Sequence, residues 1–161
     1  KSGRRYSGVD TSPAPGLDAS IGETIETLTG QPLGSPSTLA ACALITDALK
    51  SLQSKSCGYR GLMLPVLEDR VLARRAIEGR FTVNDILLYS SVCGTGIDVV
   101  PLPGDTSTEK LTGLVLDVAA LSTKYRKPLS ARLFPIPGKE PGEAISFDNP
   151  FLTNCVVMSL G

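Results

Sequence analysis

An α/β fold is predicted by three features of this 161-residue sequence. Short apolar segments of strand length are separated by longer segments with helical spacing of apolar residues, which favours an α/β sheet or barrel over a bundle or sandwich. Hydrophobic residues make up 42% of the chain and charged residues 20%, near the average of globular domains. A chain of this length buries roughly 70% of the surface that its unfolded form exposes, which is enough for one domain with a core.

The first third of the chain predicts one strand and two helices. Residues 6–11 form a short strand candidate that ends in the proline-rich stretch 12–16. A capping box at Ser20 and Glu23 opens a helix over residues 21–29. Ser35 and Pro36 then open a longer helix. Its predicted apolar face consists of Leu39, Ala43, Leu44, Ala48 and Leu52.

The middle of the chain predicts a strand, two helices and a further strand. In order, these segments are residues 59–64, 68–78, 83–92 and 97–102. The first strand is apolar and ends at Pro65, as is typical of a buried strand. Thr82 is the predicted N-cap of the second helix, with Asp85 in its first turn.

The last third predicts a helix between two strands, followed by a turn-rich loop. A capping box at Thr106 and Glu109 opens the helix. Its apolar stripe consists of Leu111, Leu114, Val115, Val118 and Leu121. Pro128 ends this helix, and residues 129–136 alternate between apolar and other side chains, which indicates a strand with two different faces. Residues 154–160 are the last predicted strand.

Charge and histidine content exclude several classes of function. Lys plus Arg and Asp plus Glu are both 16, so no net field attracts nucleic acid or an anionic membrane surface, and neither is expected as a partner. The chain contains no histidine, which excludes the usual zinc patterns, a Ser-His-Asp triad and a Cys-His pair within it. No metal site is therefore predicted, and no cofactor is assigned.

The cysteines and the hydropathy pattern predict a compartment. Cys42, Cys57, Cys93 and Cys155 show no CxxC spacing. Cys42 and Cys155 lie inside apolar segments, where a buried free thiol is the expected state. No apolar run approaches the roughly 18 residues of a membrane span, and no signal-peptide pattern opens the chain. We expect a soluble protein of the reducing cytoplasm.

The glycine-rich turn that follows residue 92 is the first candidate for chemistry. Cys93 is followed by Gly94 and Gly96, and glycines at this spacing allow another backbone or a ligand to approach closely. The pair follows a helix rather than a strand, which is the wrong order for a nucleotide-binding turn. A thiol at a helix C-terminus meets the negative end of the helix dipole, which disfavours a reactive thiolate. Cys93 is thus either a structural or a catalytic thiol.

Acidic residues near predicted strand ends form the second candidate. Asp10, Glu68 and Asp98 lie at or just after strands, and Arg132 lies on the polar side of its strand. Binding groups of α/β proteins gather at strand ends, so the carboxylates can meet as general bases or cation ligands, and Arg132 as a carboxylate or phosphate clamp. The alternative is structural: Asp10 and Asp98 cap turns, Glu68 and Asp69 begin a helix, and Arg132 pairs with one of these acids.

Four segments, in order, resemble a known family. They are GVDTSPAP (residues 8–15), GLMLPVLED (61–69), VCGTGIDVVPLPGD (92–105) and RLFPIPGK (132–139). All four resemble the domain-of-unknown-function 711 family, also called uncharacterised protein family 0210. The resemblance implies that residues 1–161 are the C-terminal part of a larger barrel domain whose N-terminal part is absent from this chain. The start at Lys1, without an initiator Met, agrees with a fragment or a processed product.

The resemblance also implies a fold and a partner. The family is similar in fold to the ten-stranded α/β barrel of glycyl radical enzymes and ribonucleotide reductases, in which a cysteine on an interior loop abstracts hydrogen. Cys93 is the residue that compares with this cysteine, although no glycyl radical motif surrounds Gly161. Because a partial barrel exposes sheet edges, we expect it to associate with the missing N-terminal part of the same protein or with another copy of the chain.

Two hypotheses about function follow, and the sequence leaves open whether the chain is an enzyme. In the first, an enzyme or binding protein of barrel fold takes a small polar or anionic metabolite. The residues assigned to its site are Cys93 and Asp98 as catalytic residues and Asp10, Glu68, Arg132, Gly94 and Gly96 as ligand-binding residues. In the second, the chain is a non-catalytic structural or regulatory assembly protein, in which glycines and prolines of the four segments serve only conformation.

Overall fold

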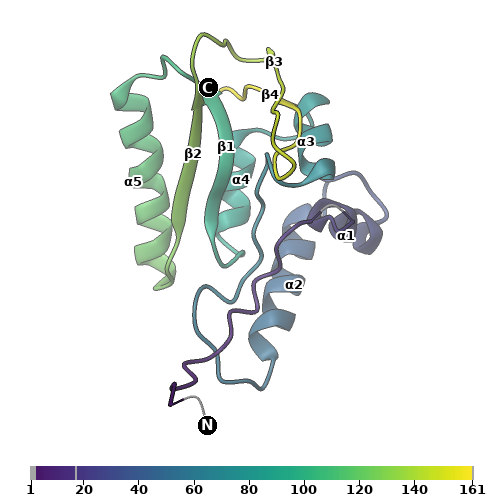
Figure 1. The fold of residues 1–161 in the computed structure, drawn as a ribbon, viewed down its shortest axis with the longest axis vertical. Helices are drawn as coiled ribbons and strands as arrows, with labels where there is room; N and C mark the ends of the chain where they lie inside the picture. The colour runs from purple at the N-terminus through teal and green to yellow at the C-terminus, as the bar shows by residue number, and fades with distance from the viewer. Residues whose placement is uncertain (1–2, 17, 161) are drawn as a thin grey trace.

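The computed structural model describes residues 3–16 and 18–160, in which helices flank a two-stranded parallel sheet (Figure 1). In chain order the elements are α1 (Ile21–Thr29), α2 (Thr38–Ser51), α3 (Arg70–Ile77), α4 (Val83–Ser90), β1 (Gly96–Pro103), α5 (Thr108–Tyr125), β2 (Ser130–Ile136), β3 (Ala144–Ile145) and β4 (Cys155–Val156). Mixed helices and a parallel sheet make the fold α/β, which confirms the predicted class. Gly161, named above for the glycyl radical comparison, lies outside the described residues.

The centre of the fold is a β1–α5–β2 unit. β1 and β2 pair in parallel from Gly96 opposite Ser130 to Pro103 opposite Ile136, and α5 connects them (Figure 1). All eight residues of β1 are buried, as expected of a central parallel strand. The register shifts between Ile97 and Val100, which marks a β-bulge. Both strands lie where the sequence predicts them.

The helix α5 begins one residue later than its predicted cap. Ser107 is the N-cap and accepts a hydrogen bond from the Lys110 N–H, whereas the Thr106 hydroxyl donates to the Pro103 carbonyl. Of the predicted stripe, Leu114 and Val118 are buried, while Val115 is exposed. The stripe that faces the core is therefore narrower than predicted, because α5 lies at the outside of the fold next to β2 (Figure 1) and packs by one side only.

Two predicted strands are extended segments without a ladder, and these predictions are wrong. Residues 6–11 make a single parallel bridge, Val9 to Ser56, and residues 59–64 lead into another, Pro65 to Asp98. The second segment is buried as predicted, at Leu62 and Leu64, but Pro65 has no N–H to donate and the β1 bulge interrupts the opposing edge. The second segment therefore cannot continue into regular pairing, whereas the first makes only its single bridge at Val9.

The helices α1 and α3 begin at one shared carboxylate. Asp69 is fully buried (0% exposed) and is the N-cap of α3. Its two oxygens accept from Ser20 Oγ (2.7 Å), Ile21 N (2.6 Å), Gly22 N (3.3 Å), Val71 N (2.9 Å) and Leu72 N (3.1 Å). The capping box predicted at Ser20 is consequently half formed: Ser20 accepts from the Glu23 N–H, but the Glu23 carboxylate pairs with Arg70.

The helix α2 buries a different face from the predicted one. Its buried residues are Thr38, Ala41, Cys42 and Thr46, whereas Leu44 of the predicted face is 61% exposed. The N-cap is Ser37, and Pro36 lies before the helix rather than in its first turn. The small buried residues share one side at i, i+3, i+4 and i+8, which allows close helix packing that hydropathy alone does not indicate.

The remaining elements match the sequence in part. Thr82 and Asp85 form the complete capping box that opens α4, as predicted. The predicted strand over residues 154–160 shortens to β4, which pairs antiparallel with β3, because the Met158 N–H turns to the Pro101 carbonyl of β1 (2.9 Å). Within the described part of the chain, no helix combines the length and hydropathy that bilayer crossing requires.

Candidate functional site

Three of the predicted site residues meet in one charged cluster beside the β1 bulge. The bulge sets Asp98 and Val99 of β1 opposite the single residue Arg132 of β2. The Arg132 guanidinium donates from Nε to Asp98 Oδ1 and lies 3.3 Å from a carboxylate oxygen of Glu68, in the turn before α3. Glu68 and Asp98, 30 positions apart in sequence, are thus joined through Arg132, a meeting that the binding hypothesis predicts and that equally fits the ion pair of the structural alternative.

The Asp98 carboxylate is buried but only half satisfied. Its side chain is 3% exposed, and its backbone carbonyl accepts from the Val66 N–H (3.2 Å). Oδ1 pairs with Arg132, whereas Oδ2 is shielded from solvent and has no hydrogen-bond partner among the described residues. Most buried polar atoms have a partner, and a buried acceptor without one costs about 1–3 kcal/mol. This oxygen is the least satisfied part of the cluster.

Charge in the cluster is negative overall. Two carboxylates, Glu68 and Asp98, surround one guanidinium, which leaves a formal charge of −1. The hydrogen bond to Asp98 raises the pKa of Arg132, so the guanidinium stays charged, while its side chain remains 53% exposed. Among the described residues, no group of three or more His, Cys, Asp or Glu side chains is placed to hold a metal ion.

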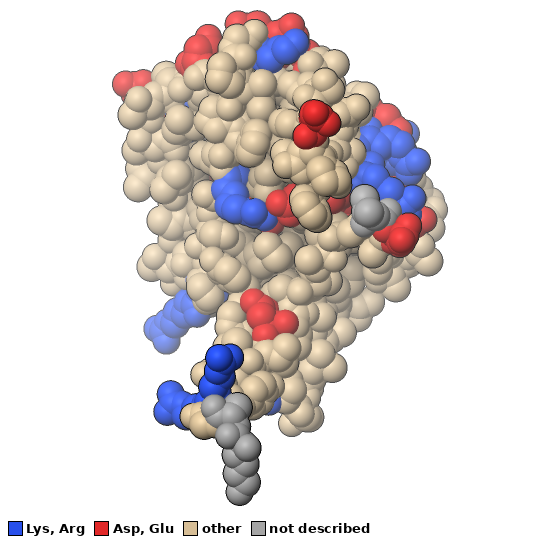
Figure 2. All heavy atoms as spheres, viewed as in Figure 1, with Lys and Arg blue, Asp and Glu red and all other residues tan. Residues whose placement is uncertain are grey.

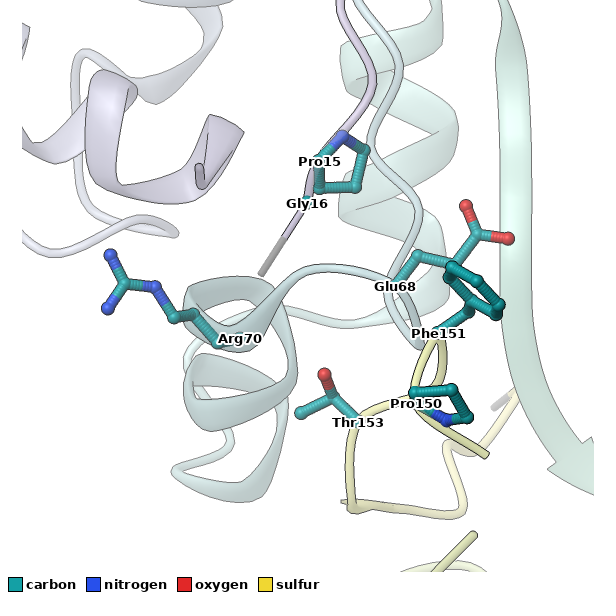
Figure 3. A pocket seen from close by; sticks show the side chains of 7 residues that line it. All are labelled: Pro15, Gly16, Glu68, Arg70, Pro150, Phe151 and Thr153. Atoms are coloured by element: carbon teal, nitrogen blue, oxygen red, sulfur yellow. The ribbon is translucent and has the colours of Figure 1, made fainter. Parts of the chain in front are cut away.

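A cavity of about 530 Å³ opens on the other side of Glu68 (Figure 3). Besides Glu68, its wall includes Pro15, Arg70, Pro150, Phe151 and Thr153. The loop that carries Phe151 is fixed beside Glu68, because the Thr153 N–H donates to the Leu67 carbonyl (2.7 Å). Glu68 therefore connects this cavity to Arg132 and, through Arg132, to the buried Asp98.

Asp10 has hydrogen-bond partners separate from the cluster and holds a loop. Its carboxylate accepts from the Ser12 N–H and hydroxyl and from the N–H groups of Tyr59 and Arg60. Desolvation opposes ionisation of this carboxyl, but the four hydrogen bonds together outweigh it and lower the pKa of Asp10. Among the described residues, neither Asp98 nor Arg132 hydrogen-bonds or pairs with Asp10, whose contacts are those of the turn cap that the structural alternative predicts.

Cys93 lies in the interior, and its glycine neighbours serve backbone packing. Cys93 is 0% exposed. A Cβ on Gly94 would lie 2.3 Å from the Gly61 Cα, and one on Gly96 would lie 2.2 Å from the Ser130 carbonyl oxygen. Both glycines therefore let two segments touch, and their close approach is to protein backbone.

Lys127, which follows α5, stabilises the turn at Cys93. Lys127 Nζ donates to the carbonyls of Ser90 (2.8 Å), Ser91 (3.0 Å) and Cys93. These carbonyls lie at the C-terminal end of α4, where a cation is favoured. Burial of the Lys127 side chain lowers its pKa. The Cys42 thiol is also buried, and this burial, together with the nearby Cys93, raises the pKa of Cys42 to about 12.

Sequence reasoning missed the part of the site that comes from the C-terminal loop. Phe151 is 79% exposed, and only the Asn149-Pro150 turn signal beside an aromatic residue could have indicated it.

The surface charge agrees with the balanced composition: on the face in Figure 2, acidic and basic groups are interspersed with uncharged surface. The described site is thus a local cluster and cavity rather than a broad charged face.

Comparison with known proteins identifies one family. The family model described as "Uncharacterised ACR (DUF711)" matches residues 1–149. A UPF0210 protein of Syntrophobacter fumaroxidans is 39% identical over 153 residues, 91% of this chain and 34% of that protein. One from Pyrobaculum islandicum is 36% identical over 162 residues, 97% of this chain and 36% of that protein. The chain spans about a third of the length of these curated relatives.

Proposed function

The chain belongs to the DUF711 family, and we propose that it binds a small polar metabolite at the cluster of Glu68, Arg132 and Asp98. One observation carries the proposal: Asp98 Oδ2 is buried without a hydrogen-bond partner among the described residues. A buried carboxylate that lacks a donor is a costly arrangement for a purely structural group. A ligand that donates to it supplies the missing hydrogen bond.

The charge of the cluster selects between the two ligand classes that the sequence predicts. Arg132, the expected clamp for an anion, already contacts both carboxylates. With a formal charge of −1, the cluster repels a further anion and attracts a hydrogen-bond donor. A polar ligand that carries hydroxyl or amino groups is therefore favoured over an anionic one.

In an enzyme this arrangement would give Asp98 the role of general base. A carboxylate with a free oxygen accepts a proton from a ligand group within hydrogen-bond reach, and Arg132 holds that carboxylate in position. Cys93 has no role in the proposal, because its side chain is buried among core residues.

We further propose that the β1–α5–β2 unit is part of the ten-stranded barrel, completed by the rest of a family-length protein. Two observations support this: the relatives are about three times as long as the chain, and β2 pairs on one edge only within the described residues. A larger sheet would cover the free edge.

The four unpaired cysteines support a cytoplasmic location.

Native mass spectrometry of the purified protein tests the binding proposal. We expect a small molecule to be retained by the wild type, and its occupancy to fall at least about tenfold in Asp98→Asn, which loses the charged acceptor, and in Arg132→Ala, which no longer holds the Asp98 carboxylate in position. Asp117→Asn, an acid on α5, is the matched control and should retain the molecule. Equal retention by all four proteins, or none by the wild type, would contradict the proposal.

A further inference from the structure

The cavity beside Glu68 indicates the chemical class of the ligand. We infer that it takes a small molecule with a primary amine at one end and an apolar, preferably aromatic, body at the other. This inference rests on the proposed function, because Glu68 belongs both to the charged cluster and to the cavity wall.

The amine is inferred from an excess of acceptors on the Glu68 side. Glu68 contacts Arg132 only at 3.3 Å and 3.4 Å, so its carboxylate can accept a stronger hydrogen bond. Behind Arg132, the buried Asp98 does not line the cavity, but its carboxylate adds a second negative charge close to it. An ammonium group supplies positive charge and three donors where both are lacking.

Arg70 does not neutralise this charge. Although Arg70 lines the cavity, Figure 3 shows its guanidinium on the opposite side from Glu68 and directed away. It pairs there with Glu23 on α1. The acidic side of the cavity is therefore at Glu68, whose carboxylate points away from Arg70 and lies beside the Phe151 ring in Figure 3, and a carboxylate or phosphate ligand would meet repulsion there.

The apolar body is inferred from Phe151 and the prolines. The Phe151 ring is 79% exposed and lines the cavity together with Pro15 and Pro150. The turn that carries it is closed, since Asn149 Oδ1 accepts from the Phe151 N–H (2.8 Å). A positioned, exposed aromatic ring near a carboxylate gives an ammonium ligand both a cation–π contact and an apolar surface.

The size of the cavity agrees with a small ligand. A volume of about 530 Å³ lies within the range of small-molecule sites, about 300–1,000 Å³. Thr153, on the same wall, adds a hydroxyl that can bond a polar substituent on the ligand.

Isothermal titration calorimetry with three probes of equal body tests the inference: 2-phenylethylamine, 2-phenylethanol and 3-phenylpropionate. We expect the amine to bind with a dissociation constant of about 1 mM or lower, as ligands of this size can, and the alcohol and the carboxylate to bind at least ~tenfold more weakly. Glu68→Gln should weaken amine binding at least about tenfold, and Phe151→Ala about three- to tenfold. Glu109→Gln, an exposed acid in the first turn of α5, is the matched control and should change nothing.

The outcomes separate this inference from the proposed function. Binding of the carboxylate or the alcohol as tightly as the amine, with dependence on Asp98, would overturn the amine class and leave the site in place. Amine binding that Glu68→Gln and Phe151→Ala leave unchanged would also overturn the inference, because the molecule then binds elsewhere. If no probe binds, the amine inference fails. The proposed function fails as well only if native mass spectrometry also finds no small molecule whose retention depends on Asp98.

Discussion

Two buried aspartates of this protein differ in how their oxygens are used. Asp69 and Asp98 are both buried, at 0% and 2% exposed. Asp69 accepts five hydrogen bonds, four from backbone N–H groups at the starts of α1 and α3. Asp98 accepts one side-chain hydrogen bond, from Arg132, and leaves Oδ2 without a partner among the described residues.

The difference separates a structural carboxylate from a functional candidate. The N–H groups of a first helical turn lack intrahelical partners, and Asp69 satisfies those of two helices with one charge. Nothing remains on Asp69 for a ligand. Asp98 is buried at a comparable cost in desolvation, but one of its oxygens lacks a hydrogen bond. A donor added at Asp98 would therefore gain binding energy that no donor could gain at Asp69.

The largest predicted effect is on Asp69. We expect Asp69→Ala to lower the free energy of unfolding by about 3–5 kcal/mol, because it leaves the N-termini of α1 and α3 buried without an acceptor. Chemical denaturation followed by circular dichroism measures this change. Asp69→Asn, which keeps one acceptor oxygen, should lose less than Asp69→Ala. A loss below about 1 kcal/mol for Asp69→Ala would show that water replaces the carboxylate.

Glu26 provides an intermediate case, in which the partners are the cations Arg75 and, more distantly at 3.8 Å, Arg74, together with one backbone group. The Arg75 guanidinium donates from Nε (2.6 Å) and Nη2 (3.0 Å), and the Leu33 N–H donates at 2.9 Å. The hydrogen bond to Arg75, opposed by burial, holds the pKa of Glu26 below its ordinary value of 4.5. A lowered pKa in the folded state means that the unfolded state binds the proton more tightly.

Stability should therefore fall as the pH falls below about 4.5. The contribution of Glu26 is fully present above the unfolded pKa and is lost as the pH passes down through the folded pKa. At neutral pH we expect Glu26→Gln to cost about 1–2 kcal/mol, in keeping with a partly buried charged hydrogen bond. Denaturation curves at pH 7 and pH 3 should show a smaller pH dependence in Glu26→Gln and in Arg75→Gln. If the difference in the free energy of unfolding between pH 7 and pH 3 were the same in both variants as in the wild type, Glu26 would not contribute to the loss of stability in acid.

Elements with strong local signals could be predicted from the sequence. The cap of α4 at Thr82 and the strands β1 and β2 depend on neighbouring residues, and the structure confirms them. The strand predicted at residues 6–11 depends on a partner some 47 positions away, and only Val9 and Ser56 form a bridge. Whether an extended segment pairs is decided by distant backbone, which no local pattern contains.

The same distinction applies to the candidate site. The meeting of Asp98 and Arg132 follows from the parallel pairing of β1 and β2, because both residues lie near the starts of these strands, and the bridge from Pro65 to Asp98 brings Glu68 beside them. Asp10 lies near a predicted strand end but caps a turn instead, since residues 6–11 do not join the sheet. Phe151 depends on a tertiary contact of its loop with Leu67, so its place on the cavity wall could not be inferred.

The smallest predicted effect on stability is that of Asp98→Asn, and it tests the comparison most sharply. Asparagine keeps an acceptor for Arg132 Nε and removes the charge from an oxygen that has no partner among the described residues. The lost ion pair and the relieved burial of charge oppose each other, so we expect the free energy of unfolding to change by less than about 1 kcal/mol. Measured beside Asp69→Asn in the same denaturation experiment, Asp98→Asn should be the milder variant. A loss as large as that of Asp69→Asn would show that Asp98 is as structural as Asp69, because the stability of the fold would then depend on its charge in the absence of any ligand.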